Sequence, residues 1–171
     1  MKTTKKLILH IGSNKGNRFE NLQKSLEYIE ENIGSIVNTS KIYETEPWGF
    51  ESDEMFLNQV VVVETQFKPM DVLEKIKKIE KLMGREGSAK RYSSRTIDID
   101  ILFYENVIFS NDQLVIPHPL LHLRKFVLIP LVEILPDWVH PCMDMTIKEL
   151  LEECTDDSIV NLYNPEEKNE N

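Results

Sequence analysis

Hydrophobic and polar positions recur with two different periods in the first 103 residues, and each period predicts its own kind of element. Residues 17–33 carry an apolar side chain every three or four positions, as an amphipathic helix does. Asn17 is a suitable N-cap, with Glu20 three residues later, and Gly34 is a suitable stop. The same reasoning predicts a second helix at 69–84 and strands at 7–11, 35–43, 56–65 and 97–103.

The order of these elements is strand, helix, strand, strand, helix, strand. It predicts the α+β class, as a ferredoxin-like βαββαβ sandwich with its helices on one face of a mainly antiparallel sheet. The rest of the chain is less regular, with a hairpin expected around Glu105 and Asn106 and helices near 127–135 and 146–154. We therefore expect one domain at 1–163, with a C-terminal extension of short strands and helices, and a disordered tail at 164–171.

Two carboxylates interrupt the apolar run of the last predicted strand. Side chains alternate across a strand, so Asp98 and Asp100 share one face, about 6.6 Å apart along the strand. The apolar side chains of the opposite face are expected to pack under the helices: Ile97, Ile99, Ile101 and Phe103. Two neighbouring carboxylates can hold Mg²⁺ and leave its other positions to water and phosphate oxygens. The alternative is an ordinary solvated strand face.

The charge distribution favours a small polyanion over a nucleic acid. The net charge of −9 opposes binding to a phosphate backbone, and no apolar run approaches the roughly 20 residues of a membrane span. Residues 85–95 nevertheless carry a local net charge of +3, directly before the two aspartates. Metal carboxylates beside arginines are typical of phosphoryl transfer from a nucleotide. The glycine loops of P-loop enzymes and protein kinases are missing, so the nucleotide must be held differently.

Length and cysteine content set the expected context. The 171 residues suit one stand-alone domain, and the first residues lack the pattern of a secretory signal. Cys142 and Cys154 lack metal-type spacing, so we expect reduced thiols. We expect a cytoplasmic protein, a monomer without nucleic-acid or membrane partners.

Seven ordered motifs make the chain resemble the 6-hydroxymethyl-7,8-dihydropterin pyrophosphokinases of folate biosynthesis. They are IGSN at 11–14, YETEPWG at 43–49, FLN at 56–58, IEKLMGR at 79–85, RTIDIDIL at 95–102, IPHP at 116–119 and LRKFVLIPL at 123–131. The resemblance implies an enzyme that transfers pyrophosphate from ATP to the pterin hydroxymethyl group and releases AMP. It also implies that Asp98 and Asp100 hold two Mg²⁺ ions, and that Arg85 and Arg95 clamp the phosphates as catalytic residues.

The resemblance also assigns the two substrates to separate groups of residues. We expect ATP to contact, besides the two arginines, Glu80, Arg91, Ile101, His118 and Arg124. We expect the pterin to contact Thr45, Trp48, Phe56, Asn58, Tyr92 and Phe126, with the amide of Asn58 reading the ring edge and Phe126 stacking on the ring.

Several of these residues have a structural alternative. Phe56 could be a core residue, Glu80 a surface ion pair, Arg124 a solvated side chain and His118 a polar residue of a proline-rich turn. Three other histidines, lacking such a match, are interpreted as structural or solvated: His10, His122 and His140.

The chain departs from some family members near the nucleotide. Gly87 and Ser88 stand where some carry further basic residues, and Gln113 and Val115 stand where some have an arginine and a threonine. Residues 86–94 and 45–55 are expected to be loops that close over the substrates. Two other functions stay open, a ligand-binding regulatory module and a two-metal phosphohydrolase.

Overall fold

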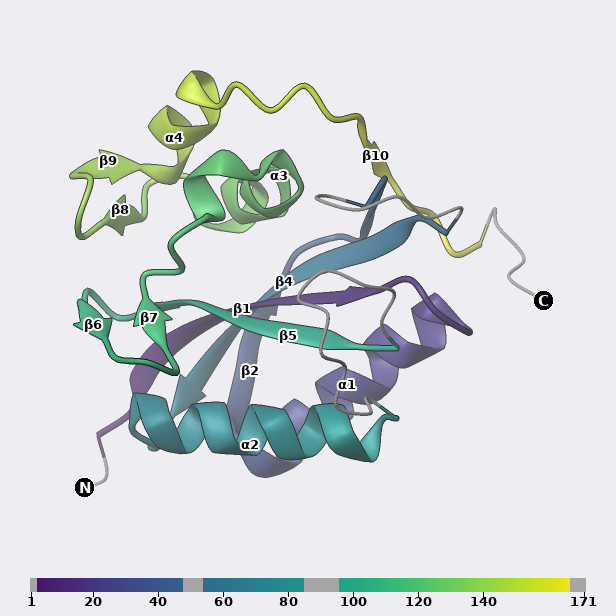
Figure 1. The fold of residues 1–171 in the computed structure, drawn as a ribbon, viewed down its shortest axis with the longest axis horizontal. Helices are drawn as coiled ribbons and strands as arrows, with labels where there is room; N and C mark the ends of the chain where they lie inside the picture. Colours follow the sequence, from purple (N-terminus) through teal and green to yellow (C-terminus); the bar gives the residue numbers. More distant parts are fainter. Residues whose placement is uncertain (1–2, 48–53, 85–95, 167–171) are drawn as a thin grey trace.

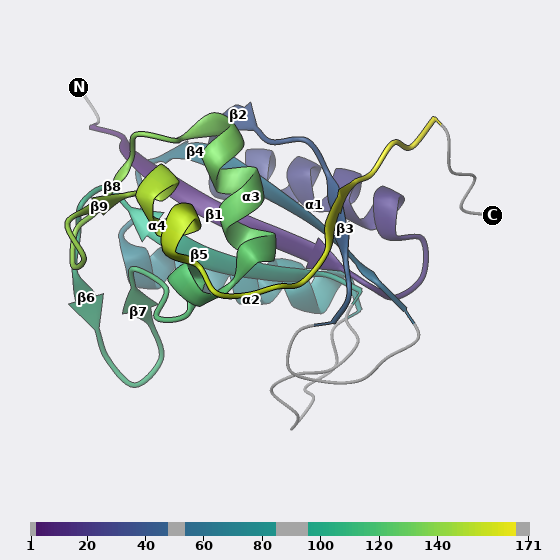
Figure 2. The same ribbon diagram turned by 90° about the horizontal axis from the view of Figure 1, so that it is seen from above.

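The protein packs helices against both faces of a central antiparallel sheet (Figure 1). The computed structural model describes residues 3–47, 54–84 and 96–166. In Figure 1, α1 and α2 lie below the sheet and α3 and α4 lie above it. Figure 2, turned by 90°, shows α3 and α4 in front of the strands of the sheet. The two helices of the expected βαββαβ unit, α1 and α2, thus share one face, and the C-terminal part of the chain supplies a second helical layer on the other face.

The elements confirm the predicted order and refine its boundaries. The α-helices are α1 (Arg18–Asn32), α2 (Pro69–Leu82), α3 (Lys125–Ile134) and α4 (Ile147–Glu153), with a short 3₁₀ helix, η1 (Leu121–Leu123), before α3. The longer strands are β1 (Lys5–Ser13), β2 (Gly34–Thr39), β4 (Phe56–Thr65) and β5 (Asp98–Tyr104). The short strands are β3 (Tyr43–Thr45), β6 (Phe109–Ser110), β7 (Val115–Ile116), β8 (Val139–His140), β9 (Met145–Thr146) and β10 (Val160–Leu162).

Local chemistry explains where the helices begin. The side chain of Asn17 accepts a hydrogen bond of 3.1 Å from the main-chain N–H of Glu20, which confirms it as the N-cap of α1. Pro69 occupies the first turn of α2, where its missing N–H costs nothing. Gly34 starts β2 instead of capping α1, and an added Cβ there would lie 2.2 Å from the carbonyl oxygen of Glu64. Glycine is needed at this position because the two strands approach so closely.

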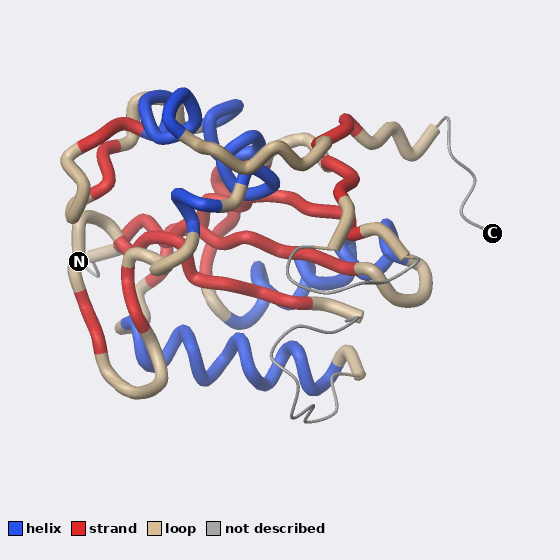
Figure 3. The backbone as a smooth tube through the Cα atoms, turned by 45° about the horizontal axis from the view of Figure 1, so that its top comes forward, coloured by secondary structure: helices blue, strands red, loops and turns tan. Residues whose placement is uncertain are grey.

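The strand order places β1 in the middle of the sheet. The order is β10-β3-β4-β1-β5, with β2 also paired to β4, and the pairings are antiparallel. Two separate hydrophobic clusters fill the two faces of this sheet. One lies between the sheet and the helices α1 and α2, and the other lies between the sheet and the helices α3 and α4. Figure 3 shows the helices, in blue, on both sides of the strands, in red. Successive side chains of β1 therefore alternate between the two clusters. Those of one face pack toward α1 and α2, and those of the other face pack toward α3 and α4.

A β-bulge in β5 changes the expected alternation of that strand. Leu9 pairs with Ile101 and Ile8 pairs with Phe103, so Leu102 is the extra residue. Ile101 packs toward α1 and α2 as expected, whereas Phe103 belongs to the cluster under α3. The prediction that Phe103 shares a face with the isoleucines is wrong, because an extra residue reverses the parity of the positions after it.

The C-terminal extension consists of short elements, as expected, but its hairpin is in another place. Glu105 and Asn106 form a turn with a positive φ of 48° at Glu105. The strand after this turn, β6, pairs with β7 and not with β5. The helices near 127–135 and 146–154 are confirmed as α3 and α4. Most of the predicted tail, from residue 167 onward, lies outside the described residues.

Candidate active site

Three adjacent strands bring the candidate residues to the sheet face that α3 covers. Gly12 in the central strand β1 pairs with Asn58 of β4 on one side and with Asp98 of β5 on the other. Two residues earlier in β1, His10 pairs with Asp100. Side chains of paired residues lie side by side on one face, so the carboxylates and the amide flank the same central strand. The register, and not proximity in sequence, assembles this site.

Asp98 and Asp100 keep part of their surface exposed, although the isoleucine between them is buried. The expected alternation is therefore confirmed for this part of β5. Within the described ranges, no three histidine, cysteine or acidic side chains gather into a metal-binding group. Two adjacent carboxylates nevertheless fit Mg²⁺, which accepts one or two protein carboxylates and takes its remaining ligands from phosphate and water.

Asn58 is the centre of a buried hydrogen-bond network, with a side chain only 1% exposed. Its Nδ2 donates to Oγ1 of Thr45 at 2.8 Å and to the carbonyl oxygen of Tyr43 at 3.3 Å. Its Oδ1 lies 3.1 Å from Nε2 of His10. The network joins two residues predicted to read the pterin, Thr45 and Asn58, and adds His10, which is interpreted from the sequence as structural or solvated.

His10 is a buried, neutral histidine at the base of this face. Burial, with the nearby positive charge of Arg124, lowers the pKa of His10 to about 3, and its hydrogen bond with Asn58 only partly opposes the shift. Its ring meets Phe126 edge to face, with centroids 5.6 Å apart. The structural alternative for His10 therefore holds, but the sequence did not predict its contacts with Asn58 and Phe126. The available signal was an isolated polar residue in an apolar strand, two positions before Gly12 and therefore on the same face.

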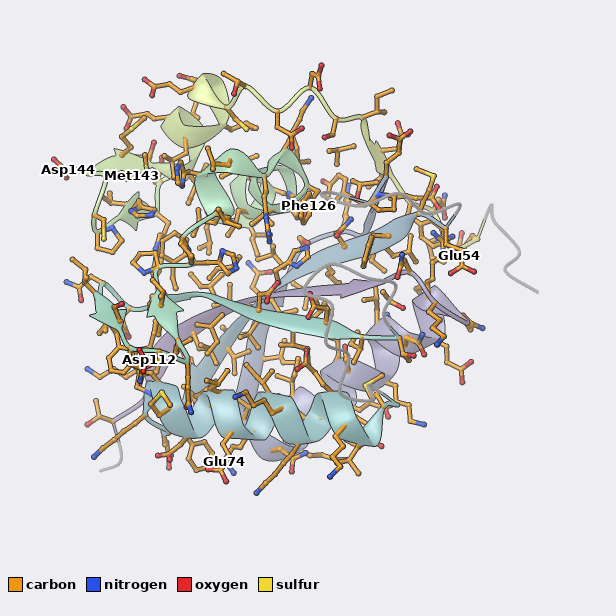
Figure 4. The ribbon with its side chains drawn as sticks, in the orientation of Figure 1. Glu54, Glu74, Asp112, Phe126, Met143 and Asp144 are labelled. Atoms are coloured by element: carbon orange, nitrogen blue, oxygen red, sulfur yellow. The ribbon has the colours of Figure 1, made fainter. Side chains whose placement is uncertain are left out.

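The start of α3 brings two further predicted residues over the sheet, Arg124 as its N-cap and Phe126 in its first turn. Phe126 lies at the boundary between α3 and the strands (Figure 4), and Cζ of Arg124 lies 5.7 Å from the centre of its ring. Arg124 is 8% exposed, so the alternative of a solvated arginine is wrong. A buried guanidinium close to an aromatic ring is a positive charge held in a defined place.

Glu133 near the end of α3 ties this helix to the sheet edge. Its Oε1 accepts a hydrogen bond of 2.6 Å from the hydroxyl of Tyr43, and both of its carboxylate oxygens accept from the main-chain N–H of Lys41. Burial and this carboxylate raise the pKa of Tyr43 to about 12, so the hydroxyl stays a donor. The carbonyl oxygen of Tyr43 also accepts a hydrogen bond from Asn58. The contact of Glu133 with Tyr43 therefore connects α3 to the hydrogen-bond network of Asn58.

His118 and Glu80 approach β5 from two other elements. The main-chain N–H of His118 donates to the carbonyl of Leu102, and its Nδ1 accepts from the N–H of Leu120 at 3.1 Å. A neutral His118 therefore carries its proton on Nε2 and can donate to an anion. Glu80 is 5% exposed and accepts a hydrogen bond of 3.1 Å from the N–H of Ile99, between the two aspartates. Glu80 therefore lies in the interior, and the alternative of a surface position for it is wrong.

Two more predicted residues differ in accessibility. Ile101 is 4% exposed within the apolar cluster, so only its main chain could meet a nucleotide. Phe56 is partly exposed on the site face, and a Cβ added at Gly12 would lie 3.6 Å from its Cδ1. Phe56 is therefore a residue of the site face and not of the core.

Five predicted residues lie outside the described residues: Trp48, Arg85, Arg91, Tyr92 and Arg95. The basic segment with Gly87 and Ser88, and most of the expected loop at 45–55, lie there too.

The amino-acid sequence has matches among known proteins. The family model for 7,8-dihydro-6-hydroxymethylpterin-pyrophosphokinase (HPPK) matches residues 8–136. A 2-amino-4-hydroxy-6-hydroxymethyldihydropteridine pyrophosphokinase of Aquifex aeolicus is 41% identical over 149 residues, which cover 87% of this chain and 92% of that protein. A folate synthesis bifunctional protein of Arabidopsis thaliana is 41% identical over 133 residues, covering 78% of this chain and 28% of that protein.

The fold also has solved counterparts. A crystal structure of wild-type Plasmodium falciparum HPPK-DHPS with pteroate superposes with a TM-score of 0.75 at 20% sequence identity. The match covers 90% of this chain and 45% of that longer chain, so it describes a shared fold for part of the larger protein. In the described part of this chain, no helix has the length and apolar character that a membrane span requires.

Proposed function

The chain belongs to the 7,8-dihydro-6-hydroxymethylpterin-pyrophosphokinase family, an enzyme family of folate synthesis, and we propose that it transfers pyrophosphate from ATP to 6-hydroxymethyl-7,8-dihydropterin. One observation carries the proposal. Two partly exposed carboxylates on β5 share a sheet face with the buried amide network of β4, and β1 lies between them. A triphosphate needs the first group and a heterocyclic ring edge needs the second.

The reaction forms one bond to phosphorus and breaks another. The hydroxymethyl oxygen of the pterin bonds to the β-phosphorus of ATP, and the bond from that phosphorus to the oxygen shared with the α-phosphorus breaks. AMP leaves with this oxygen and its electron pair, and the hydroxyl proton is released to solvent. When bound, two Mg²⁺ ions held by Asp98 and Asp100 would neutralise the triphosphate and the charge that develops on the leaving oxygen.

The side chains around the carboxylates would bind and orient the nucleotide. The Nε2–H of His118 is a donor suited to a phosphate oxygen, and Arg124 adds a buried positive charge near the same face. Glu80 would act through β5, because its bond to Ile99 holds the strand between the two aspartates. Contacts of ATP with the main chain of Ile101, and with Arg85, Arg91 and Arg95 from the basic segment, remain part of the proposal.

The pterin would lie between the amide network and α3. Phe126 offers a ring face for stacking, and Phe56 lies on the same sheet face. Asn58 and Thr45 are buried below, with polar atoms suited to a ring edge that mixes donors and acceptors. Trp48 and Tyr92 complete the proposed pterin contacts. This arrangement would hold the hydroxymethyl group toward the triphosphate and shield both from water.

The fold and context complete the proposal. The strand order β2-β4-β1-β5 with α1 and α2 on one face supports a ferredoxin-like βαββαβ unit, to which β3, β10 and the α3–α4 layer are added. We propose that 1–163 is one domain, since the strand β10 near its end pairs with β3. The free thiols of Cys142 and Cys154 suit a reducing cytoplasm, and a monomer suffices because both proposed substrate groups come from one chain.

The decisive test incubates the purified protein with ATP, Mg²⁺ and 6-hydroxymethyl-7,8-dihydropterin and separates the products. We expect AMP and the pterin diphosphate in equal amounts, and ADP as the nucleotide product would overturn the proposal. Nucleotide hydrolysis at the same rate without the pterin would identify a phosphohydrolase. Binding of both ligands without any product would identify a ligand-binding module.

A further inference from the structure

The direction of the hydrogen bonds around Asn58 can be deduced from a single unambiguous group. The carbonyl oxygen of Tyr43 can only accept, so the amide end that faces it must be Nδ2, which also donates to Thr45. The opposite end of the amide, 3.1 Å from Nε2 of His10, is therefore the oxygen. Because an amide oxygen can only accept, His10 must donate to it, and its proton lies on Nε2.

The same deduction determines what the network can offer to a ligand. Both N–H groups of Asn58 are occupied, so its amide retains only a lone pair on Oδ1. The hydroxyl of Thr45 accepts from Asn58 and can still donate its own hydrogen. The pair therefore presents an acceptor beside a donor. A rotated amide would reverse this pattern and would set two oxygens, those of Asn58 and Tyr43, against each other.

His10 contacts two residues of the proposed pterin site at once. It donates to Asn58 through Nε2, and its ring packs edge to face against Phe126. A Cβ at Gly12 would lie 3.4 Å from Cε1 of His10 and 3.7 Å from Oδ1 of Asn58, so imidazole and amide meet above this glycine. His10 is 4% exposed, and within the described residues its Nδ1 has no hydrogen-bond partner. It is therefore placed to support other side chains and not to be solvated.

We propose that His10 is a positioning residue of the pterin site, whose Nε2–H holds the amide of Asn58 in one orientation while its ring supports Phe126. The inference rests on the proposed function, because it treats Asn58 and Phe126 as pterin contacts. His10 touches neither substrate in this role. It acts on pterin affinity and leaves the reacting phosphates to other residues.

A matched pair of variants at His10 separates the effect of its hydrogen-bond donor from the effect of its side-chain volume. His10→Gln places an amide donor near the position of Nε2, whereas His10→Met has similar length without a donor. We expect His10→Met to raise the KM for the pterin about five- to tenfold, the loss of about one hydrogen bond, with kcat and the KM for ATP changed less than twofold. His10→Gln should recover most of the pterin affinity. Equal pterin KM values for wild type and His10→Met would overturn the proposal.

Two further measurements keep this test independent of folding and of turnover. The control His140→Met also removes a buried histidine, one that binds the turn before β9, and should lower stability without changing the pterin KM. Nitrogen-15 NMR of the imidazoles in the intact wild type should show His10 protonated on Nε2 and bare on Nδ1. The opposite tautomer would overturn the proposal without any assay.

The failure of this inference can be told from failure of the proposed function. A wild type that releases no AMP with the pterin would refute the function, whatever the variants do. A wild type that is active, together with a His10→Met protein that is equally active at low pterin, would refute only the role of His10. Calorimetric titration with 6-hydroxymethyl-7,8-dihydropterin, in the presence of a non-hydrolysable ATP analogue, should reproduce the five- to tenfold difference as a ratio of Kd values.

Discussion

Asp100 of β5 lies directly opposite His10 of β1 in the antiparallel register. Two directly paired positions of the sheet therefore carry a carboxylate proposed to hold Mg²⁺ and the imidazole that is hydrogen-bonded to Asn58. The two proposed substrate regions, phosphate and pterin, are thus neighbours across a single strand. The distance between the two regions is set by the main-chain hydrogen bonds between strands. Such a distance varies less than the distance between residues on loops.

Neutralising either aspartate should abolish most activity without unfolding the protein. We expect Asp98→Asn and Asp100→Asn each to lower kcat on the order of 10²–10³-fold, because one of two carboxylates at the reacting phosphates loses its charge. Both side chains are partly exposed, so the urea midpoint should change little. Rates of AMP release at saturating substrate measure the effect, with exposed Asp112→Asn as the matched control. Near-normal rates in both variants would refute the metal assignment.

Removing the ring of Phe126 should affect the pterin more than ATP. We expect Phe126→Ala to raise the KM for the pterin about fivefold, since stacking contributes on the order of 1 kcal/mol, and to change the KM for ATP less. Phe126→Tyr, which keeps the ring, should stay close to wild type. The control Phe67→Ala removes an aromatic ring that contacts Lys75 and is not part of the proposed site. This variant should leave both KM values unchanged. Equal changes for the two substrates would argue against stacking on the pterin.

The hydrogen bond between Tyr43 and Glu133, which connects the sheet edge to α3, can be followed by spectroscopy. Glu133→Gln removes the negative charge that helps to hold the proton of Tyr43, so the pKa of Tyr43 should fall from about 12 toward its usual value of 10.0. Ultraviolet titration of tyrosinate absorbance against a Tyr43→Phe reference measures this shift. We also expect a loss of about 1 kcal/mol in the free energy of unfolding, because a charge-assisted hydrogen bond becomes a neutral one. An unchanged Tyr43 titration would contradict the tie.

His10 should make stability depend on pH in the acidic range. Its pKa is about 3 in the folded protein and about 6.5 when unfolded, so between these values the unfolded chain binds an extra proton. Its contribution is fully present above pH 6.5 and is lost as the pH falls toward 3, at up to about 1.4 kcal/mol per pH unit. Urea unfolding at pH 7, 6 and 5 should therefore show a steeper decline for wild type than for His10→Gln. His140, whose pKa burial also lowers, remains in both proteins and cancels.

Local patterns in the sequence determined much of the framework. The β-branched run of β4, the Pro69 start of α2 and the Asn17 cap of α1 are short-range effects, so they were predictable and are confirmed. The shared face of Asp98 and Asp100 follows from strand alternation alone. Family membership, too, was readable from motifs, because residues 8–136 carry them in order.

Only the tertiary structure decided which of these residues meet. His10 and Asn58 are 48 positions apart, and their contact depends on the register of β1 against β4. The bulge at Leu102, which turns Phe103 away from the isoleucines, arises from pairing with β1 and has no local signal. Arg124 is buried because α3 covers the second face of the sheet. Short-range propensities act over a few residues, whereas strand register and layer packing depend on the free energy of the whole fold.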